Sequence, residues 1–162
     1  RTGRDRRIRG HTRVVIRLGS RDDVHMTEHQ DGHLALKVHM MPKDTNAFGT
    51  IFGGVILSLI DQAGFDEARK HGLHRWVTVA FDRVEFLQPV YTGDVVSLYT
   101  HLIEAGRTSV KIGVKVVSNR YDSNECIHVT SGSVTMVSVD ADGRPIPFDS
   151  PSTIHPDKDQ TT

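Results

Sequence analysis

The distribution of apolar and polar positions divides the chain into several strands and one helix. Residues His33–Met40 alternate between apolar and polar side chains, which is the period of a half-buried strand. Four later stretches also have strand-like composition, and Gly-Asp, Ala-Gly and Asp-Gly pairs mark turns beside them. These stretches are Trp76–Phe86, Asp94–Glu104, Thr108–Ser118 and Cys126–Val139. Because their connections are short, consecutive strands are expected to pair antiparallel.

Residues Val55–Lys70 follow a different pattern, which predicts a helix. The segment is too long for a typical strand, is rich in Leu and Ala, and is followed by Gly72. Its first half is apolar almost all round, so the helix is expected to be buried on most sides. The preceding residues, Met41–Thr50, have the Pro, Asp, Asn and Gly content of a loop. One buried helix and about five strands predict an α+β architecture, in which a curved antiparallel sheet wraps around one long central helix.

The same architecture predicts a partner chain and polar ends. One helix cannot cover a whole sheet and remain dry in so small a core, so an open helix flank and sheet edge are expected to meet a second copy. We therefore expect a homodimer, and leave open a trimer of such dimers. Residues 1–25 are expected to form an Arg-rich flexible extension, 26–147 the domain, and 148–162 a polar tail.

Composition narrows the class of protein. The 162 residues suit one domain, and a hydrophobic fraction of 37% with 25% charged residues is ordinary for a soluble globular protein. Net charge is zero, which argues against capture of nucleic acid or a membrane surface. Residues 1–17 nevertheless hold seven arginines and one acid, leaving 13 basic and 19 acidic residues in the remainder. The single Cys126 excludes an intramolecular disulfide and favours a reducing compartment, the cytoplasm.

Asp61 is the unusual residue of the predicted helix. Its neighbours are core types, and a buried carboxylate without a partner is costly. One interpretation is that Asp61 turns to a solvated seam. The other is a catalytic base, since Gly53 and Gly54 at the helix entry leave backbone N–H groups that can hold an oxyanion. Asn46 in the loop and Thr78 on the next strand add groups that could bind water or a carbonyl, although each is also an ordinary residue for its position.

Long segments of the chain resemble hotdog-fold acyl-CoA thioesterases, specifically the YciA-like and cytosolic acyl-CoA hydrolase group. The strongest resemblance is in residues 41–61 (MPKDTNAFGTIFGGVILSLID). Residues 86–96 (FLQPVYTGDVV), 106–112 (GRTSVKI) and 139–145 (VDADGRP) are also similar to that group. The resemblance extends from about Leu34 to Pro147. It implies a hotdog fold and hydrolysis of acyl-CoA thioesters to free CoA and a carboxylic acid.

The resemblance also implies roles for individual residues. The family's helix carboxylate falls on Asp61, as general base or nucleophile, and its oxyanion glycine falls on Gly53. The family's loop amide falls on Asn46, and a strand hydroxyl near Thr78. The sequence departs from the pattern at Thr50, where relatives often carry Asp or Asn. In the resembling family each site is shared between two antiparallel helices, so Gly53 of one chain is expected opposite Asp61 of the other.

The substrate and its chemistry set two further expectations. A thioester is already electrophilic and its thiolate leaves easily, so no metal and no cofactor other than CoA in the substrate is expected. The phosphates of CoA need cations, and candidates lie near the predicted turn at Gly106; solvated basic residues at a strand end are the alternative interpretation. The candidates are Arg107, Thr108, Ser109 and Lys111.

Three other interpretations have less support. A hotdog dehydratase would use a His with the helix carboxylate, and no His lies in the Pro42–Gly54 loop or on the helix before His71. A non-catalytic acyl-CoA sensor would lack a base such as Asp61. His25, His29 and His33 have the spacing of ligands on one helix face, but Asp31-Gly32 would break that helix, so no metal site is expected.

Overall fold

The computed structural model describes residues 32–154. The Arg-rich segment 1–17, the rest of the expected extension up to residue 25, and residues 155–162 lie outside the described residues. The elements in chain order are β1 (His33–His39), η1 (Pro42–Asp44), α3 (Gly53–Ala68), η2 (Arg69–His71), β2 (Arg75–Asp82), β3 (Val95–Ala105), β4 (Ser109–Asn119) and β5 (Cys126–Val139).

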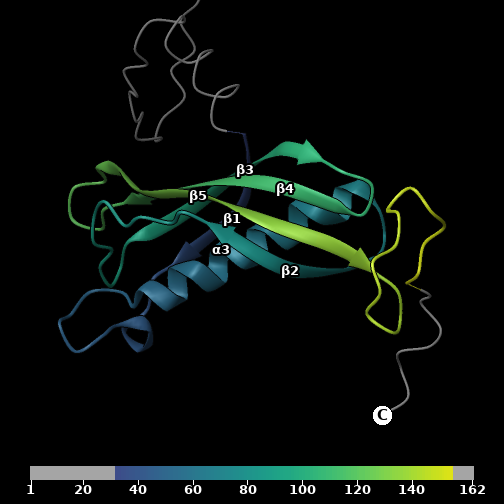
Figure 1. Cartoon of the computed structure of the whole chain (residues 1–162). Coiled ribbons are helices and arrows are strands. Elements are labelled where there is room, and N and C mark those ends of the chain that lie inside the picture. The colour runs from purple at the N-terminus through teal and green to yellow at the C-terminus, as the bar shows by residue number, and fades with distance from the viewer. Residues whose placement is uncertain (1–31, 155–162) are drawn as a thin grey trace, which may run out of the picture.

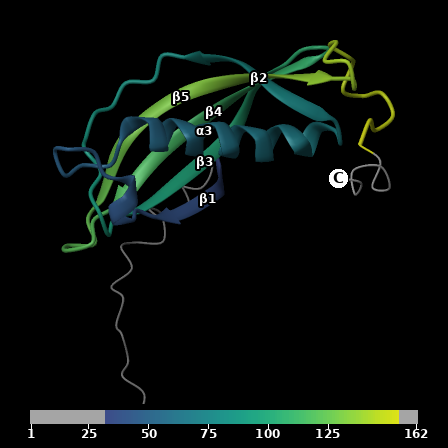
Figure 2. The ribbon, with the colours of Figure 1, turned by 90° about the horizontal axis from the view of Figure 1, so that it is seen from below.

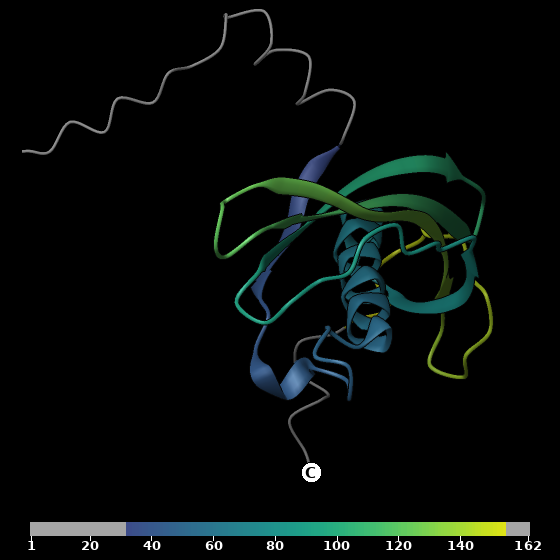
Figure 3. The ribbon, with the colours of Figure 1, turned by 90° about the vertical axis from the view of Figure 1, so that its left-hand side faces the viewer.

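All five strands form one antiparallel sheet in the order β1-β3-β4-β5-β2. The helix α3 lies along one face of this sheet (Figure 1). Figure 2 shows the strands arching over α3, and Figure 3, viewed nearly along the helix axis, shows the sheet curving around it. The expected curved sheet around one central helix is confirmed.

Alternation along the strands determines which side chains meet the helix. On β4, Val110, Ile112 and Val114 are buried in the core that contains α3. Lys111 falls between them and therefore projects from the opposite face of the sheet. The helix contributes buried Ile56, Leu59, Ile60, Ala63 and Ala68 to the same core. In the first half of the helical segment, Ile56, Leu59 and Ile60 are buried, whereas Val55 and Leu57 are half-buried and Ser58 is exposed. One flank of the helix is therefore open in the single chain.

Glycine brings the helix close to β5. A Cβ atom at Gly64 would lie 2.4 Å from Cγ1 of Val134, so no other residue fits there without movement. The helix also begins two residues earlier than the pattern of apolar residues predicts. Phe52 is its N-cap in an extended conformation without a side-chain cap, so Gly53 and Gly54 form the first turn. Their N–H groups accordingly lie at the positive end of the helix dipole.

The strand expected over Trp76–Phe86 is too long by four residues. It ends at Asp82, and Arg83 follows with φ of 32°, a left-handed conformation that interrupts the strand. The alternation of apolar and polar side chains does not reveal such a local break in the strand. Strand β2 is also an edge of the sheet, and its exposed apolar side chains are Val77, Val79 and Phe81.

The segment after β5 packs against the start of β2 and the residues just before it. Phe148, the first residue of the expected polar tail, lies against Trp76 with ring centroids 5.8 Å apart. The Nε2 of buried His74 is 2.9 Å from the carbonyl oxygen of Phe148, and the Ser152 hydroxyl donates to the carbonyl of Leu73. Residues 148–152 therefore contact the domain, through one aromatic ring and several polar contacts that composition does not reveal.

Candidate functional site

The carboxylate of Asp61 is held at the middle of α3 by the neighbouring strand. The Thr78 hydroxyl on β2 donates a hydrogen bond of 2.5 Å to Oδ1 of Asp61. Asp61 is half-buried, and among residues 32–154 this is the hydrogen bond that its carboxylate makes. Its Oδ2 is therefore available to a water molecule or a substrate. The structure brings these two predicted site residues together.

A pocket of about 450 Å³ opens directly beside this pair. The helix contributes Gln62, Phe65 and Asp66 to its lining, in addition to Asp61. The sheet contributes Trp76, Val77 and Met136, in addition to Thr78. Trp76, Val77 and Met136 were not among the residues that sequence analysis assigned to a site. In the sequence these three residues look like ordinary core residues. The pairing of β2 with β5 places them beside Asp61.

The entry to α3 forms a separate group. The N–H groups of Gly53 and Gly54 have no helical partner because they lie in the first turn. The Phe86 ring packs over Gly53, 3.5 Å from where a Cβ would lie. This end of the helix can therefore present backbone donors to a developing negative charge.

Asn46 and Thr50 close the loop that leads into this turn. The Asn46 amide group donates to the Thr50 hydroxyl at 2.8 Å, and its Oδ1 accepts the backbone N–H groups of Phe48 and Thr50. Asn46 therefore orders the loop through its own side chain. Thr50, the departure from the family pattern, supplies the acceptor for the Asn46 amide.

One chain does not bring the two groups together. Gly53 and Asp61 are eight residues apart on α3, which corresponds to about 12 Å along the helix axis. An oxyanion donor and a base must both lie within about 3 Å of the reacting groups. Within one chain, the Asp61 carboxylate and the Gly53 N–H group therefore lie at different levels of α3, too far apart to act on one thioester group.

The candidate phosphate-binding residues lie at the β3–β4 turn and on β4. Lys111 projects from the sheet face opposite α3 and forms an ion pair of 2.6 Å with Asp82. The hydrogen bond and charge of Asp82 raise the pKa of Lys111, and the same partner lowers the pKa of Asp82. The carbonyl groups of Arg107 and Thr108 accept the backbone N–H groups of Phe148 and Ser138. The structure does not gather these residues around Asp61.

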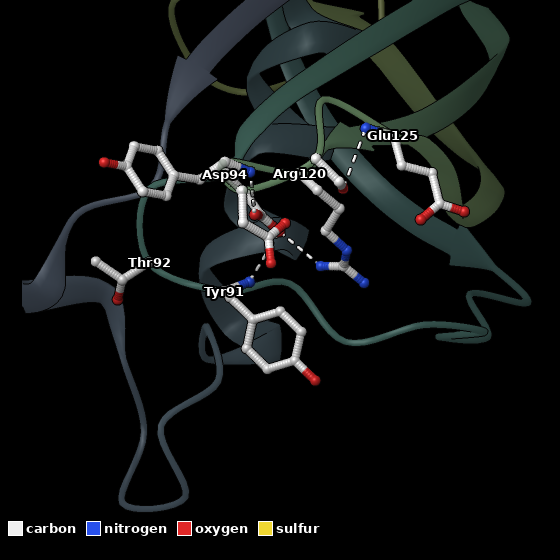
Figure 4. Close-up of a pocket in the computed structure, with 8 residues that line it drawn as sticks. Tyr91, Thr92, Asp94, Arg120 and Glu125 are labelled. Atoms are coloured by element: carbon white, nitrogen blue, oxygen red, sulfur yellow. Dashed lines mark hydrogen bonds and ion pairs between the residues drawn. The ribbon is translucent and has the colours of Figure 1, made fainter.

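A buried carboxylate that sequence analysis did not single out lies near the helix entry. Figure 4 shows Asp94 between Tyr91 and Arg120 in a second pocket of about 310 Å³. Its carboxylate accepts from the N–H of Tyr91, the N–H of Tyr121, the Ser118 hydroxyl, and Arg120 at 2.6 Å. Burial alone would raise the pKa of Asp94, but these donors together lower it. Its only sequence signal was a Gly-Asp turn.

The described part of the chain has neither a metal-binding cluster nor a membrane-spanning helix. No arrangement of three or more His, Cys, Asp or Glu side chains within residues 32–154 could hold a metal ion. His25 and His29 lie outside these residues. No helix in the same range is long and apolar enough to cross a membrane.

Comparison with known proteins places this geometry in a family. Residues 48–120 match the model of the thioesterase superfamily. An uncharacterized acyl-CoA thioester hydrolase of Zymomonas mobilis is 44% identical over 114 residues, which cover 70% of this chain and 76% of that protein. The acyl-CoA thioester hydrolase YciA of Salmonella typhimurium is 36% identical over 72% of this chain and 90% of its own length.

Solved structures agree with the sequence relatives. A hexameric hotdog-fold thioesterase of Campylobacter jejuni superimposes with a TM-score of 0.69 at 45% identity, covering 74% of this chain and 92% of that one. A hexameric broad-specificity acyl-coenzyme A thioesterase, HI0827, superimposes with a TM-score of 0.70 at 38% identity, covering 75% and 90%. The chain therefore belongs to the thioesterase superfamily, within its YciA-like group, and has the hotdog fold.

Proposed function

We propose that this protein hydrolyses acyl-CoA thioesters to free CoA and a carboxylic acid, with Asp61 as the central catalytic group. The observation that carries the proposal is the Asp61–Thr78 pair at an apolar pocket. Thr78 occupies Oδ1 and leaves Oδ2 free to act. The relatives named above are acyl-CoA thioester hydrolases, and an acyl-CoA hydrolase of Staphylococcus aureus, 29% identical with a TM-score of 0.63 over 69% of this chain and 68% of that one, was solved with butyryl-coenzyme A.

The chemistry requires only a base and hydrogen-bond donors. As general base, Asp61 takes a proton from water while the water oxygen adds to the thioester carbonyl carbon. The Gly53 N–H stabilises the oxyanion of the tetrahedral intermediate. When the carbon–sulfur bond breaks, the thiolate leaves and receives the proton from Asp61. In the alternative, Asp61 attacks the carbonyl carbon as a nucleophile and expels the CoA thiolate, which leaves a mixed anhydride. Water then hydrolyses this anhydride, regenerates the Asp61 carboxylate and supplies the proton that the thiolate takes up. Neither route uses a metal or a separate cofactor.

The contacts to CoA remain part of the proposal. Arg107 is exposed at the β3–β4 turn, beside the hydroxyl groups of Thr108 and Ser109. These residues are our candidates for the CoA phosphates, because a guanidinium group binds phosphate in a bidentate manner. Lys111 is the weakest candidate of this group, since Asp82 already pairs with its ammonium group. We place the reaction in the cytoplasm, where free CoA thiols and Cys126 stay reduced.

We further propose that two chains share each site. The half-site of Asp61 and the half-site of Gly53 are about 12 Å apart along one helix. Two antiparallel copies of α3 related by a twofold axis would place Gly53 and Asn46 of one chain opposite Asp61 and Thr78 of the other. The edge position of β2 and its exposed apolar side chains are consistent with a homodimer. Hexameric relatives would correspond to three such dimers.

Release of thiol from acyl-CoA tests the activity directly. We expect the protein to release free CoA from at least one acyl-CoA in a series from acetyl- to dodecanoyl-CoA. A sensor would bind acyl-CoA and release none, so binding without thiol release would reject the hydrolase and favour a non-catalytic module.

Mixed dimers test the shared site. Asp61→Ala and Asn46→Ala damage opposite half-sites, so each homodimer should be nearly inactive. Denaturing, mixing and refolding the two variants should restore part of the wild-type activity, because each heterodimer has one intact site. If heterodimers form but the mixture is as inactive as its parents, each site belongs to a single chain.

A further inference from the structure

The pocket beside Asp61 extends toward the C-terminal end of α3. Phe65 lies four residues after Asp61, about one helical turn or 6 Å further along the axis. Trp76 lies two residues before Thr78 and therefore on the same face of β2. Both residues line the pocket. The pocket is thus lined by the Asp61–Thr78 pair at one level of the helix and by Phe65 about one turn further along, with Trp76 on the facing strand.

The far part of this pocket is apolar. Met136 is 1% exposed and Trp76 6%, so both form its inner wall, whereas Phe65 is partly exposed at its rim. Gln62 and Asp66 lie on the exposed side of the helix. The pantetheine arm of CoA carries two amides that would lose their hydrogen bonds against this inner wall, and an acyl chain loses none. The wall therefore matches the acyl part of the substrate.

Trp76 is held from two sides. Its indole N–H donates to the carbonyl of Gly72 at 3.0 Å. The ring of Phe148 lies behind it, with centroids 5.8 Å apart and an angle of 38° between the ring planes. Phe148 is in turn fixed by His74, at 2.9 Å from its carbonyl, and by the carbonyl of Arg107, which accepts its N–H. The C-terminal segment therefore supports the indole.

We propose that Trp76, supported by Phe148, is the end wall of an acyl subsite and limits the length of the acyl chain that the enzyme accepts. This inference rests on the proposed hydrolysis at Asp61. A depth of one helical turn, at roughly 1.3 Å per carbon along a chain, accommodates about four or five carbons. The preferred substrates are accordingly short, linear acyl-CoA thioesters. Phe148 acts through Trp76 as a positioning residue and does not touch the substrate.

The test compares chain-length profiles of kcat/KM from butyryl- to dodecanoyl-CoA. Trp76→Ala should raise the ratio of decanoyl- to butyryl-CoA hydrolysis by roughly tenfold or more, the scale of a few methylene groups in an apolar pocket. Phe148→Ala should raise the same ratio by a smaller factor, and Phe148→Tyr, which retains the ring, should restore the wild-type profile. Tyr121→Ala, at an exposed turn outside this pocket, is the matched control and should leave the profile unchanged.

Alternative outcomes separate this inference from the proposed function. If Trp76→Ala and Phe148→Ala lower hydrolysis of all chain lengths equally, the residues are merely structural and the subsite is wrong. If the wild-type protein hydrolyses no acyl-CoA, the proposed function fails. The acyl subsite can then be tested separately by measuring acyl-CoA binding. Trp76 is the single tryptophan of the chain, so its fluorescence reports directly on the wall. Asp61→Asn protein titrated with butyryl-CoA should change this fluorescence, and no change at saturation would overturn the subsite.

Discussion

Two aspartates near the same helix have opposite surroundings. Asp94 is 2% exposed and accepts four hydrogen bonds, one of them from the Arg120 guanidinium group. Asp61 is half-buried, accepts one hydrogen bond from Thr78, and lines an apolar pocket. Both carboxylate oxygens of Asp94 accept hydrogen bonds from buried or half-buried donors, whereas Oδ2 of Asp61 has no donor among the described residues.

We interpret this difference as that between a structural carboxylate, Asp94, and the proposed reactive one, Asp61. Asp94 ties the residues before β3 to the end of β4, and the neighbouring Val90 carbonyl accepts the N–H of Ile51 at the entry to α3. Glu67, at the other end of α3, resembles Asp94: burial alone would raise its pKa, but the hydrogen bonds from Lys70 and Thr100 lower it. A buried acid with several donors is stabilised as a charge. An acid with one donor beside a cavity is available for chemistry.

The largest effect should follow from changing the reactive carboxylate. Asp61→Asn keeps the size of the side chain and removes the base, so we expect kcat to fall by at least roughly a hundredfold. Thermal unfolding should shift little, because the amide oxygen can still accept from Thr78. Steady-state hydrolysis and calorimetry on the same preparation measure both quantities. Near-normal turnover of every acyl-CoA would reject Asp61 as base or nucleophile.

The structural carboxylate should give the converse result. Asp94→Asn leaves Arg120 without its charged partner in a buried setting, which should lower the free energy of unfolding by about 3 kcal/mol. Ser118→Ala removes only a neutral donor from the same carboxylate and should cost about 1 kcal/mol. Urea denaturation measures both. Well below the unfolding temperature, the folded Asp94→Asn variant should retain hydrolysis; a loss as large as that of Asp61→Asn would make the two aspartates functionally alike.

Acidic pH should destabilise the folded protein by protonating the structural carboxylates of Asp94 and Glu67. The pKa values of Asp94 and Glu67 are lowered in the folded protein. Their stabilisation is therefore fully present above the unfolded carboxyl pKa of about 4 and is lost as pH falls through the lower folded values. We expect the melting temperature to decline steeply below about pH 4. The decline should be shallower for Asp94→Asn measured over the same series, and identical slopes would show that Asp94 does not contribute.

The smallest effect should come from the surface pair. Lys111→Met removes the partner of Asp82 on the exposed face of the sheet, where solvent screens the interaction. We expect no measurable change in melting temperature and a KM for acyl-CoA within about twofold of wild type. Arg107→Ala is the informative comparison, because its guanidinium group is the stronger candidate for the CoA phosphates. A larger rise in KM for Lys111→Met than for Arg107→Ala would reverse this assignment.

Local pattern was sufficient for the elements of the fold. The alternation of β4 and β5 and the apolar first half of α3 are properties of residues close together in the chain, and their periods of two and 3.6 residues can be recognised without the fold. The same reasoning singled out Asp61, since a carboxylate among core residues is costly without a purpose. Local pattern did not locate the end of β2, because the left-handed Arg83 interrupts it without any change in alternation.

The contacts that give each group its role needed the tertiary structure. Thr78 reaches Asp61 across 17 residues of sequence, and that contact depends on how β2 registers against β5 and the helix. In the sequence Asp94 is recognised only as a turn residue, whereas the structure shows that Arg120 binds its carboxylate. Phe148 appeared as the start of a polar tail until its ring met Trp76. Sequence by itself determined the elements and singled out Asp61 as the candidate reactive acid, because short-range periodicity and burial cost are local. Only the tertiary structure decided which carboxylates accept several hydrogen bonds and which side chains line the pocket beside Asp61. The reason is that hydrogen bonds and packing join residues that are far apart in the sequence.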